Sequence, residues 1–467
     1  MMPPPASVII FGITGDLSRR YLLPSLYHLL AANLLPTPLI IVGVTRRDPN
    51  KQQIRHHLIE RLQATGQTVE PQLVNQLMDM VQLQSLDLTA ADSYHTLADY
   101  LDQLEQQAGI CLSRLFYLSI PPTAYGPVVD LLGEAGLHRS CHHGQPSRLM
   151  VEKPFGYDLE SATELITRLT RNFHEDQIYR IDHYLAKETA QNLLVFRNAN
   201  PVFSAVWNRH HTKAITITSS ETIGIEGRAA FYDPVGALRD VVQNHLLQLL
   251  ALVTMEPPAG RSPAALHAAK LRLLEDIVPI PADQVMRQTQ RGQYSGYKRD
   301  AANPTSTTET FARLELTIAN DRWRGVPVII QNGKALDRKT TEIEFTFADS
   351  GLPEAGTNRL VFRLQPDEGI AVDLLAKRPG FADQTDTVSM DFAYASSFAG
   401  HTQPTAYERV LLDGLKGDQS LFATSAEILA SWKIIDNVIS EWAKTAKDLH
   451  TYDHGSAPHS IGKQRSK

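Results

Sequence analysis

The chain has 467 residues, of which 43% are hydrophobic and 21% charged, and its formal net charge is −6. This length predicts two or three domains rather than one simple core. The acidic balance argues against nucleic acid or an anionic membrane as the main partner, so any anion site must be a local basic cluster.

The first predicted element is a buried strand, Ser7-Val-Ile-Ile-Phe11, a short apolar run rich in β-branched residues. Gly12-Ile-Thr-Gly-Asp-Leu-Ser-Arg-Arg20 follows at once, and a helical pattern covers 21–32. Strand, glycine turn and helix are the context of a nucleotide-binding fingerprint, because glycines let the backbone approach a pyrophosphate and the helix N-terminus stabilises its charge. One glycine of the usual trio is missing, and Ser18 takes the helix-packing position.

A second strand, Leu39-Ile-Ile-Val-Gly-Val-Thr45, ends in Arg46-Arg47. In a dinucleotide-binding fold an acidic residue near this point binds the ribose 2′-hydroxyl of NAD, whereas arginine suits the 2′-phosphate of NADP. The alternative is two solvated loop arginines. With the glycine turn upstream, we favour NADP and keep NAD as the weaker alternative.

The remainder of the first half alternates between helix and strand. We expect an amphipathic helix over 51–80, a strand over 81–88, a helix over 92–108, a strand over 114–120, a helix over 124–135 and a strand over 147–152. This order predicts a mainly parallel, doubly wound α/β sheet, which binds ligands at the carboxyl ends of its strands. Lys153 stands at such an end, before Pro154, a candidate for a cis peptide bond. The alternative for Lys153 is an ordinary loop lysine.

Beyond Asp176 the pattern changes. Strand-like runs follow one another without regular helices between them, at 214–220, 310–318, 326–330, 342–347, 359–364 and 370–375. They indicate a larger α+β domain on a mainly antiparallel sheet. Helical segments lie within 239–255 and 404–447. We therefore place a domain boundary near residue 177, with domains at 1–177 and 178–467.

The stretch Arg180-Ile-Asp-His-Tyr-Leu-Ala-Lys-Glu188 holds three kinds of useful group. Asp182 is a carboxylate. His183 and Lys187 are four residues apart, so on a helix they would share a face, and both can donate hydrogen bonds to a dianionic phosphate. The alternative is an exposed helix start with incidental charges.

A later helix, 238–252, is apolar nearly all round and should be buried. It nevertheless carries Asp240, Asn244 and Gln248 as an i,i+4 stripe, with His245 beside it. Such a stripe needs partners when it is buried. A single buried histidine is usually structural, but the stripe and a facing carboxylate favour catalysis here.

These residues resemble the glucose-6-phosphate dehydrogenase family. The shared motifs run in family order along nearly the whole chain: Gly12–Arg20, Glu152–Gly156, Arg180–Glu188, Glu221–Gly227, Asp240–Gln248, Met255–Pro258, Arg291–Tyr294, Thr308–Phe311, Arg322–Pro327, Gly333–Leu336, Gln365–Gly369 and Ala406–Asp413.

The resemblance implies a Rossmann-like domain and hydride transfer from C1 of glucose 6-phosphate to NADP, the first step of the oxidative pentose phosphate pathway. His245 would be the general base, oriented by Asp182. The implied cofactor contacts are Gly12, Thr14, Gly15, Asp16, Leu17, Arg19, Arg46, Asp87, Leu88 and Lys153. The implied substrate contacts are His183, Tyr184, Lys187, Glu221, Asp240 and Lys334. No metal is required, and the family is usually dimeric or tetrameric.

Some positions depart from the family pattern. The family usually has Gly at Ala186, an Arg-Thr pair at Gln331-Asn332 and more often Lys at Tyr21. These changes bear on phosphate affinity and cofactor preference, and none removes a proposed catalytic group. Two alternatives remain open: another Rossmann-type sugar oxidoreductase, and a non-catalytic paralogue acting as a regulatory partner. The pair His183 and Lys187 argues against the first, and the presence of Asp182 and His245 argues against the second.

The location expected for the protein is the cytoplasm. No apolar run reaches the roughly 18 residues that span a bilayer, and the N-terminus lacks the basic and apolar regions of a signal peptide. Cys111 and Cys141 are too few for a disulfide framework and fit a reducing compartment.

Overall fold

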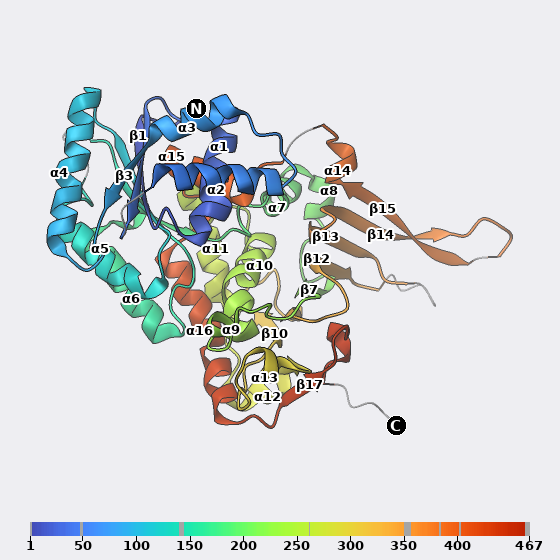
Figure 1. The fold of residues 1–467 in the computed structure, drawn as a ribbon. Helices are drawn as coiled ribbons and strands as arrows, with labels where there is room; N and C mark the ends of the chain where they lie inside the picture. Colours follow the sequence, from blue (N-terminus) through green and yellow to red (C-terminus); the bar gives the residue numbers. More distant parts are fainter. Residues whose placement is uncertain are drawn as a thin grey trace.

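Two β-sheets organise the molecule, and helices pack around and between them (Figure 1). The computed structural model describes residues 2–46, 50–139, 144–260, 262–349, 356–382, 384–400 and 403–462. Arg47 and Cys141, which were named from the sequence, lie outside these residues.

The first sheet has seven strands in the order β16-β6-β5-β4-β1-β2-β3. Their bounds are β1 Ala6–Phe11, β2 Leu39–Thr45, β3 Val81–Ser85, β4 Ser113–Leu118, β5 Ser147–Val151, β6 Ile178–Ile181 and β16 Phe422–Ala423. All neighbours are parallel except β16, which joins β6 antiparallel. The doubly wound parallel sheet is confirmed. It extends beyond residue 177 through β6, and it takes β16 from the far end of the chain.

Alternating side chains of β1 enter two different cores, as a strand with both faces covered requires. Ile9 and Phe11 belong to one core, and Val8 and Ile10 belong to the other. The first core is covered by α4 (Ala91–Ala108), α5 (Tyr125–Glu134) and α6 (Leu159–Asn172). The second is covered by α1 (Leu23–Ala31), α2 (Lys51–Ala64), α3 (Pro71–Met80) and α15 (Ala406–Lys416).

The single helix expected over 51–80 is wrong, because the chain forms two helices there. Gly66 lies between α2 and α3 with φ +75°, a conformation that glycine adopts without steric cost. Pro71 opens α3 at a position where its missing N–H is harmless.

The second sheet has ten strands and is largely antiparallel, as predicted. Nine run in the order β15-β14-β13-β12-β7-β11-β10-β9-β17, and β8 pairs with β10. The bounds are β7 Thr212–Ser220, β8 Ile277–Val278, β9 Thr289–Tyr294, β10 Phe311–Ile318, β11 Val328–Gly333, β12 Thr340–Phe347, β13 Arg359–Gln365, β14 Gly369–Lys377, β15 Thr385–Ala393 and β17 Leu449–Tyr452. Two pairs, β7–β11 and β9–β17, are parallel. The hairpin β14–β15 projects away from the body of the molecule (Figure 1).

The long helices of the second half pack between the sheets. They are α7 (Glu188–Ala199), α10 (Leu247–Thr254), α11 (Pro263–Asp276) and α16 (Ser425–Lys444), with short helices α8 Pro201–Ser204, α9 Ala229–Tyr232, α12 Val285–Gln288, α13 Tyr297–Asp300 and α14 Tyr394–Ser397. A π-helix, η4 (Leu238–Leu246), leads directly into α10. Leu246 and Leu250 share one continuous core with Phe11 of the first sheet and Phe345 of the second. The seam between the two halves is therefore apolar, which ties the halves together.

Cys111 is disulfide-bonded, a bond that the low cysteine count did not predict. In the described part of the chain, no helix is both long enough and apolar enough to cross a membrane.

A fully buried ion pair ties α11 to α16. Lys270 Nζ donates to Glu427 Oε2 at 2.8 Å, and neither side chain is exposed. Lys270 also donates to Gln248 Oε1 of α10 at 3.2 Å, and His267 Nδ1 lies 2.9 Å from Glu427 Oε1. Removing one partner of such a pair is costly because it leaves a buried charge uncompensated.

Lys270→Met should lower the free energy of unfolding by about 3 kcal/mol, measured by urea denaturation. The matched control is Lys433→Met, because Lys433 lies on the exposed face of α16. This substitution should change the free energy of unfolding by less than about 0.5 kcal/mol. Equal effects of the two substitutions would contradict the assignment of the stabilising role to the buried pair.

Candidate active site

The candidate site lies where the turn after β6 meets the π-helix η4. The sequence predicts an α-helix with Asp240, Asn244 and Gln248 on one stripe, and the chain instead winds as a π-helix over Leu238–Leu246 and as an α-helix only from Leu247. Asn244 Nδ2 donates to the carbonyl of Arg239 at 3.0 Å, and the His245 N–H donates to Asn244 Oδ1 at 2.7 Å. The helix is buried as predicted, but the α-helical winding expected for its first half is wrong.

His245 and Asp182 form a direct pair. His245 Nδ1 lies 2.5 Å from Asp182 Oδ1, and the two side chains are only 2% and 5% exposed. The backbone N–H of Tyr184 also donates to Asp182 Oδ1, at 2.9 Å. This geometry leaves Nε2 as the basic nitrogen when Nδ1 carries the proton. The pairing expected between these two residues is therefore present in the geometry.

Burial and charge act in opposite directions on this pair. Burial alone raises the pKa of Asp182, but the charge and hydrogen bond of His245 bring it below its ordinary value. Burial lowers the pKa of His245, and Asp182 offsets only part of that effect. The stable form at neutral pH is consequently an ionised Asp182 beside a neutral His245.

Lys153 reaches into the same cluster from the end of β5. Its Nζ lies 2.9 Å from His245 Nε2, donates to the Asp240 carbonyl at 2.9 Å, and lies 3.3 Å from Asp240 Oδ1. The Lys153–Pro154 peptide bond is cis, as predicted. Burial raises the pKa of Asp240, but the charges of Lys153 and Lys334 lower it by a larger amount. The pKa of Asp240 is therefore below its ordinary value.

His183, Tyr184 and Lys187 gather on a turn rather than on a helix. Residues 182–187 precede α7, whose first residue is Glu188, so the expected shared helical face is wrong. The three side chains still converge. The Tyr184 ring stacks on His245 with centroids 4.3 Å apart, His183 packs edge-on against His245 at 4.6 Å, and Lys187 Nζ lies 4.8 Å from the Tyr184 ring centre.

Gln365, the first residue of the Gln365–Gly369 motif, holds this turn in place. Lys187 Nζ donates to its side-chain oxygen, and its Nε2 donates to Thr341 Oγ1 at 2.9 Å and to the Tyr184 hydroxyl at 3.4 Å. Burial lowers the pKa of Lys187, and burial holds the pKa of His183 well below its ordinary value. The pairing of Gln365 with Lys187 depends on tertiary contact over 178 residues of chain, which no local signal indicates.

Glu221 and Lys334 form the other side of the cluster. Their side chains make an ion pair, and Lys334 lies over the Tyr232 ring at 5.3 Å. The departures at Gln331 and Asn332 have structural roles next to it: Gln331 donates to Thr218 Oγ1 at 2.9 Å, and Asn332 donates to the Ala237 carbonyl at 3.2 Å. The structure thus brings all six proposed substrate contacts around the His245–Asp182 pair or its immediate partners.

The departure at Ala186 also has a simple explanation. Ala186 is buried in the second core at 1% exposure, and it is not among the residues with positive φ. A side chain at this position therefore causes no backbone strain of the kind that requires glycine.

A crevice of about 380 Å³ opens at the carboxyl ends of β1, β2, β3 and β4. Strand order reverses between β1 and β4, which is where open α/β sheets bind dinucleotides. Six of the ten proposed cofactor contacts line it: Gly12, Thr14, Gly15, Arg19, Arg46 and Leu88. The sequence did not indicate the other lining residues, Val44, Thr45, Leu86, Ser119, Ile120 and Pro121.

The glycine turn fits a phosphate-bearing cofactor. Gly12 has φ +82°, and a Cβ there would lie 2.4 Å from the Ser119 carbonyl oxygen, so only glycine is tolerated. Ser18 is fully buried and donates to the Gly12 carbonyl at 3.0 Å, as expected for the helix-packing position. The chain can therefore approach a pyrophosphate closely, with Arg46 at the crevice wall.

Four proposed cofactor contacts do not line this crevice. Asp16 is exposed and pairs with Arg20 at 2.7 Å, and Leu17 packs against the second core. Asp87 accepts hydrogen bonds from Thr89, and these bonds, with a smaller effect of the Arg46 charge, lower its pKa. Lys153 belongs to the His245 cluster instead.

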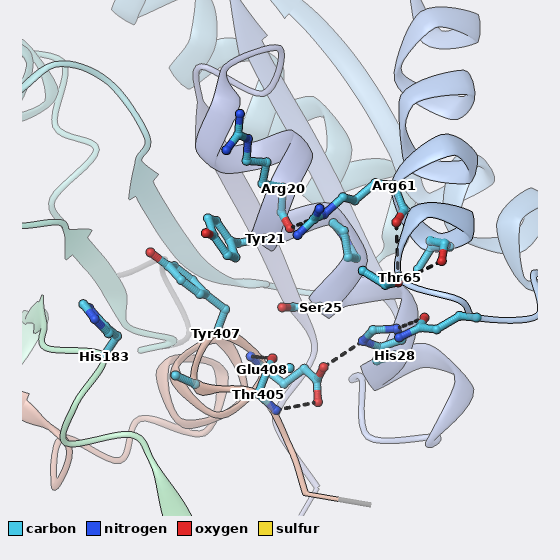
Figure 2. A pocket seen from close by; sticks show the side chains of 14 residues that line it. Arg20, Tyr21, Ser25, His28, Arg61, Thr65, His183, Thr405, Tyr407 and Glu408 are labelled. Atoms are coloured by element: carbon cyan, nitrogen blue, oxygen red, sulfur yellow. Dashed lines mark hydrogen bonds and ion pairs between the residues drawn. The ribbon is translucent and has the colours of Figure 1, made fainter. Parts of the chain in front are cut away.

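A separate cavity of about 430 Å³ lies between α1, α2 and the start of α15, with His183 at its edge (Figure 2). Tyr21, at a position where the family more often has lysine, stacks on Tyr407 with centroids 4.7 Å apart. Tyr407 hydrogen-bonds the partly buried Glu152, and burial raises the pKa of Glu152 to about 7. His28 and Glu408 close the far side at 2.7 Å. Tyr21 and Tyr407 therefore line this cavity together with His183. Tyr21 brings no positive charge to it, unlike the lysine more common in the family.

The cluster has the groups needed to oxidise an alcohol. Nε2 of a neutral histidine can accept a hydroxyl proton while a hydride leaves the same carbon for an acceptor in the adjoining crevice. Among the described residues, no group of three or more His, Cys, Asp or Glu side chains is placed to hold a metal ion.

A parallel sheet with a crevice where its strand order reverses, next to a buried histidine–carboxylate pair, is typical of a nicotinamide-dependent oxidoreductase. Two family models match the chain: glucose-6-phosphate dehydrogenase, NAD binding domain, over residues 9–192, and glucose-6-phosphate dehydrogenase, C-terminal domain, over residues 194–464. The chain belongs to the glucose-6-phosphate dehydrogenase family, as the motifs predicted.

Individual relatives agree with the family models. Glucose-6-phosphate 1-dehydrogenase 2 of Mycobacterium tuberculosis is 40% identical over 460 residues, which cover 94% of this chain and 88% of that protein. A solved structure of glucose-6-phosphate dehydrogenase in complex with its substrate glucose-6-phosphate superposes with a TM-score of 0.91 at 33% identity, covering 98% and 96% of the two chains. The enzyme from Mycobacterium avium gives a TM-score of 0.84 at 35% identity, covering 97% and 95%.

Proposed function

We propose that this chain transfers hydride from C1 of glucose 6-phosphate to NADP, giving the 6-phosphoglucono-lactone and NADPH. The observation that carries the proposal is the buried His245–Asp182 pair beside a dinucleotide crevice in a chain of this family. The cofactor, when bound, accepts the hydride at its nicotinamide ring. The residues of the chain then hold the sugar, receive the hydroxyl proton and exclude water.

His245 is the general base in this proposal. Its Nε2 takes the proton from the C1 hydroxyl, and Asp182 fixes the tautomer and stabilises the imidazolium that forms. Lys153, 2.9 Å from that nitrogen, keeps the imidazole neutral before substrate binds and lies within reach of the same hydroxyl oxygen. Asp240, Glu221 and Lys334 supply hydrogen-bonding groups for the sugar.

His183, Tyr184 and Lys187 are proposed to hold the 6-phosphate. Burial keeps His183 neutral, so it can donate one hydrogen bond, while Lys187 supplies the charge. Lys187 is already oriented by Gln365. Phosphate binding remote from C1 then places the reacting carbon, so binding energy serves catalysis.

The test of the proposed function is an initial-rate assay of the purified protein with glucose 6-phosphate and with glucose. Glucose 6-phosphate should be strongly preferred, and Lys187→Ala should raise KM for glucose 6-phosphate while leaving the rate with glucose nearly unchanged. Lys339→Ala, a change to a neighbouring surface cation outside the proposed contacts, is the control. Equal rates with glucose and glucose 6-phosphate in the unaltered enzyme would contradict the proposal and favour another sugar oxidoreductase.

The pH dependence of kcat/KM follows from the protonation of His245. Because its pKa is below the ordinary 6.5, the imidazole stays neutral down to lower pH, and activity is lost only as pH falls through that lowered pKa. The acid limb should therefore lie below pH 6.5. An acid limb above pH 7 would contradict this arrangement.

Arg46 is proposed to bind the 2′-phosphate of NADP from its place in the crevice wall. Arg46→Ala should reduce the preference for NADP over NAD by about 10- to 100-fold, since a charge-assisted hydrogen bond contributes about 1.5–3 kcal/mol. The ratio of kcat/KM for the two cofactors measures the effect. Arg61→Ala, outside this crevice, should leave the ratio unchanged, and an unchanged ratio in Arg46→Ala would remove the proposed role.

We propose three further properties: self-association, a domain division near residue 177 and a cytoplasmic location. Support for a homodimer or homotetramer comes from β15, which ends the second sheet and exposes Val388 and Met390 by 45% and 64%. The change from a parallel to a mainly antiparallel sheet supports a division in this region of the chain, but it falls after β6 (Ile178–Ile181) rather than at residue 177. The cytoplasm suits the substrate and cofactor, whose charges prevent unaided passage across a bilayer. No nucleic acid or membrane partner is proposed.

A further inference from the structure

A small cavity of about 20 Å³ adjoins the His245–Asp182 pair. Asp182 and His245 form part of its wall, and Ser431 of α16 forms another part. Polar cavities of this size hold a single water molecule. The lining is polar enough to bind one, because Gln243 and Gln248 also contribute to it.

Two buried oxygen atoms in this wall have no hydrogen-bond partner within the described chain: Asp182 Oδ2 and Ser431 Oγ. The other carboxylate oxygen of Asp182, Oδ1, receives both His245 Nδ1 and the Tyr184 N–H. A buried ionised carboxylate with an unpaired oxygen is costly, and native proteins usually satisfy such atoms with a buried water. The two unpaired atoms share one cavity, so one molecule can serve both.

Ser431 is held at this wall by its helix. A serine in the middle of a helix commonly donates to the carbonyl four residues before it, but the Ser431 hydroxyl makes no such bond, although the residue is only 2% exposed. The next residue, Trp432, donates from Nε1 to the Phe155 carbonyl at 3.0 Å. This bond fixes α16 against the loop that carries Lys153.

We propose that one buried water molecule in this cavity accepts a hydrogen bond from Ser431 Oγ and donates one to Asp182 Oδ2. Ser431 is then a positioning residue: it touches neither substrate nor cofactor, and it acts on His245 through the water and Asp182. The inference rests on the proposed function, in which His245 is the base.

The water has a defined electrostatic effect. A hydrogen bond to Oδ2 stabilises the Asp182 carboxylate most when His245 is neutral, because the carboxylate then has no cationic partner on its ring side. Without that bond, protonation of His245 becomes more favourable and its pKa rises. The other charged or titratable groups that act on the pair are Lys153, Asp240, His183 and Glu152, and none of them is altered by a change at Ser431.

The test compares the pH dependence of kcat in the full-length enzyme for four variants. Ser431→Val fills the cavity with methyl groups and removes the hydroxyl, Ser431→Ala removes only the hydroxyl, and Ser431→Thr keeps it. Ile428→Val is the matched control, since Ile428 lines the same cavity without a polar atom. Thermal melting checks that each variant is folded.

Ser431→Val and Ser431→Ala should move the acid limb of kcat upward by about half a pH unit or more, on the magnitude of a hydrogen bond to a charged group, with KM for glucose 6-phosphate changed less than about twofold. Ser431→Thr should restore the original limb, and Ile428→Val should leave it in place. The proposal is overturned if neither hydroxyl-deleting variant moves the limb, or if Ile428→Val moves it equally.

A high-resolution crystal structure of the unaltered enzyme gives an independent answer. It should show one ordered water within hydrogen-bond distance of both Asp182 Oδ2 and Ser431 Oγ. If the neighbouring side chains are well ordered and no water is present, the proposal is overturned. This result does not depend on whether the variants fold. The two proposals fail differently. An unaltered enzyme without glucose 6-phosphate oxidation rejects the function, whereas an active enzyme with an unchanged limb in Ser431→Val rejects only the water bridge.

Discussion

The hydrogen bond between His245 Nδ1 and Asp182 Oδ1 is the contact on which the site depends. Each partner comes from a different part of the fold: Asp182 follows the last parallel strand of the first sheet, and His245 lies on the π-helix that leads into the core of the second half. Both side chains are almost completely buried. The carboxylate can stay ionised there because the imidazole and a backbone N–H satisfy one of its oxygens.

Holding these two groups at 2.5 Å requires a rigid seam, and the fold provides it in two ways. One continuous apolar core crosses from the first sheet through α10 and α16 to the second sheet. Polar links then fix individual elements: the Lys270–Glu427 pair joins α11 to α16, and Trp432 joins α16 to the loop after β5. The apolar core supplies most of the association, and the polar links set the relative positions of the helices.

Much of the fold could be predicted from the sequence, because its strong signals are local. The apolar runs of β1, β2 and β5 are bounded by glycine, proline or charged residues, and the alternation of strands with helices specifies a parallel sheet. The motifs also identified the family. β16 could not be predicted, because a two-residue strand is defined only by its pairing with β6 across more than 240 residues.

For the site, too, the residue types could be predicted from the sequence, whereas the contacts between distant segments could not. Asp182, His183, Lys187 and His245 were singled out because their residue types and buried surroundings suit proton transfer and phosphate binding. Their geometry was not predictable. An i,i+4 spacing carries no sign that residues 182–187 form a turn or that Leu238–Leu246 winds as a π-helix. Gln365 and Ser431 act only through tertiary neighbours, so no sequence pattern points to them.

The most direct test of the central claim is a double-mutant cycle of Asp182→Asn and His245→Asn, with kcat measured for all four enzymes. If the two residues act as one unit, each single change should lower kcat by about 10²–10⁴-fold, and the double variant should be no slower than the His245 variant. Multiplicative losses, with the double variant slower by the product of the two single effects, would contradict a shared role and show that the residues act independently.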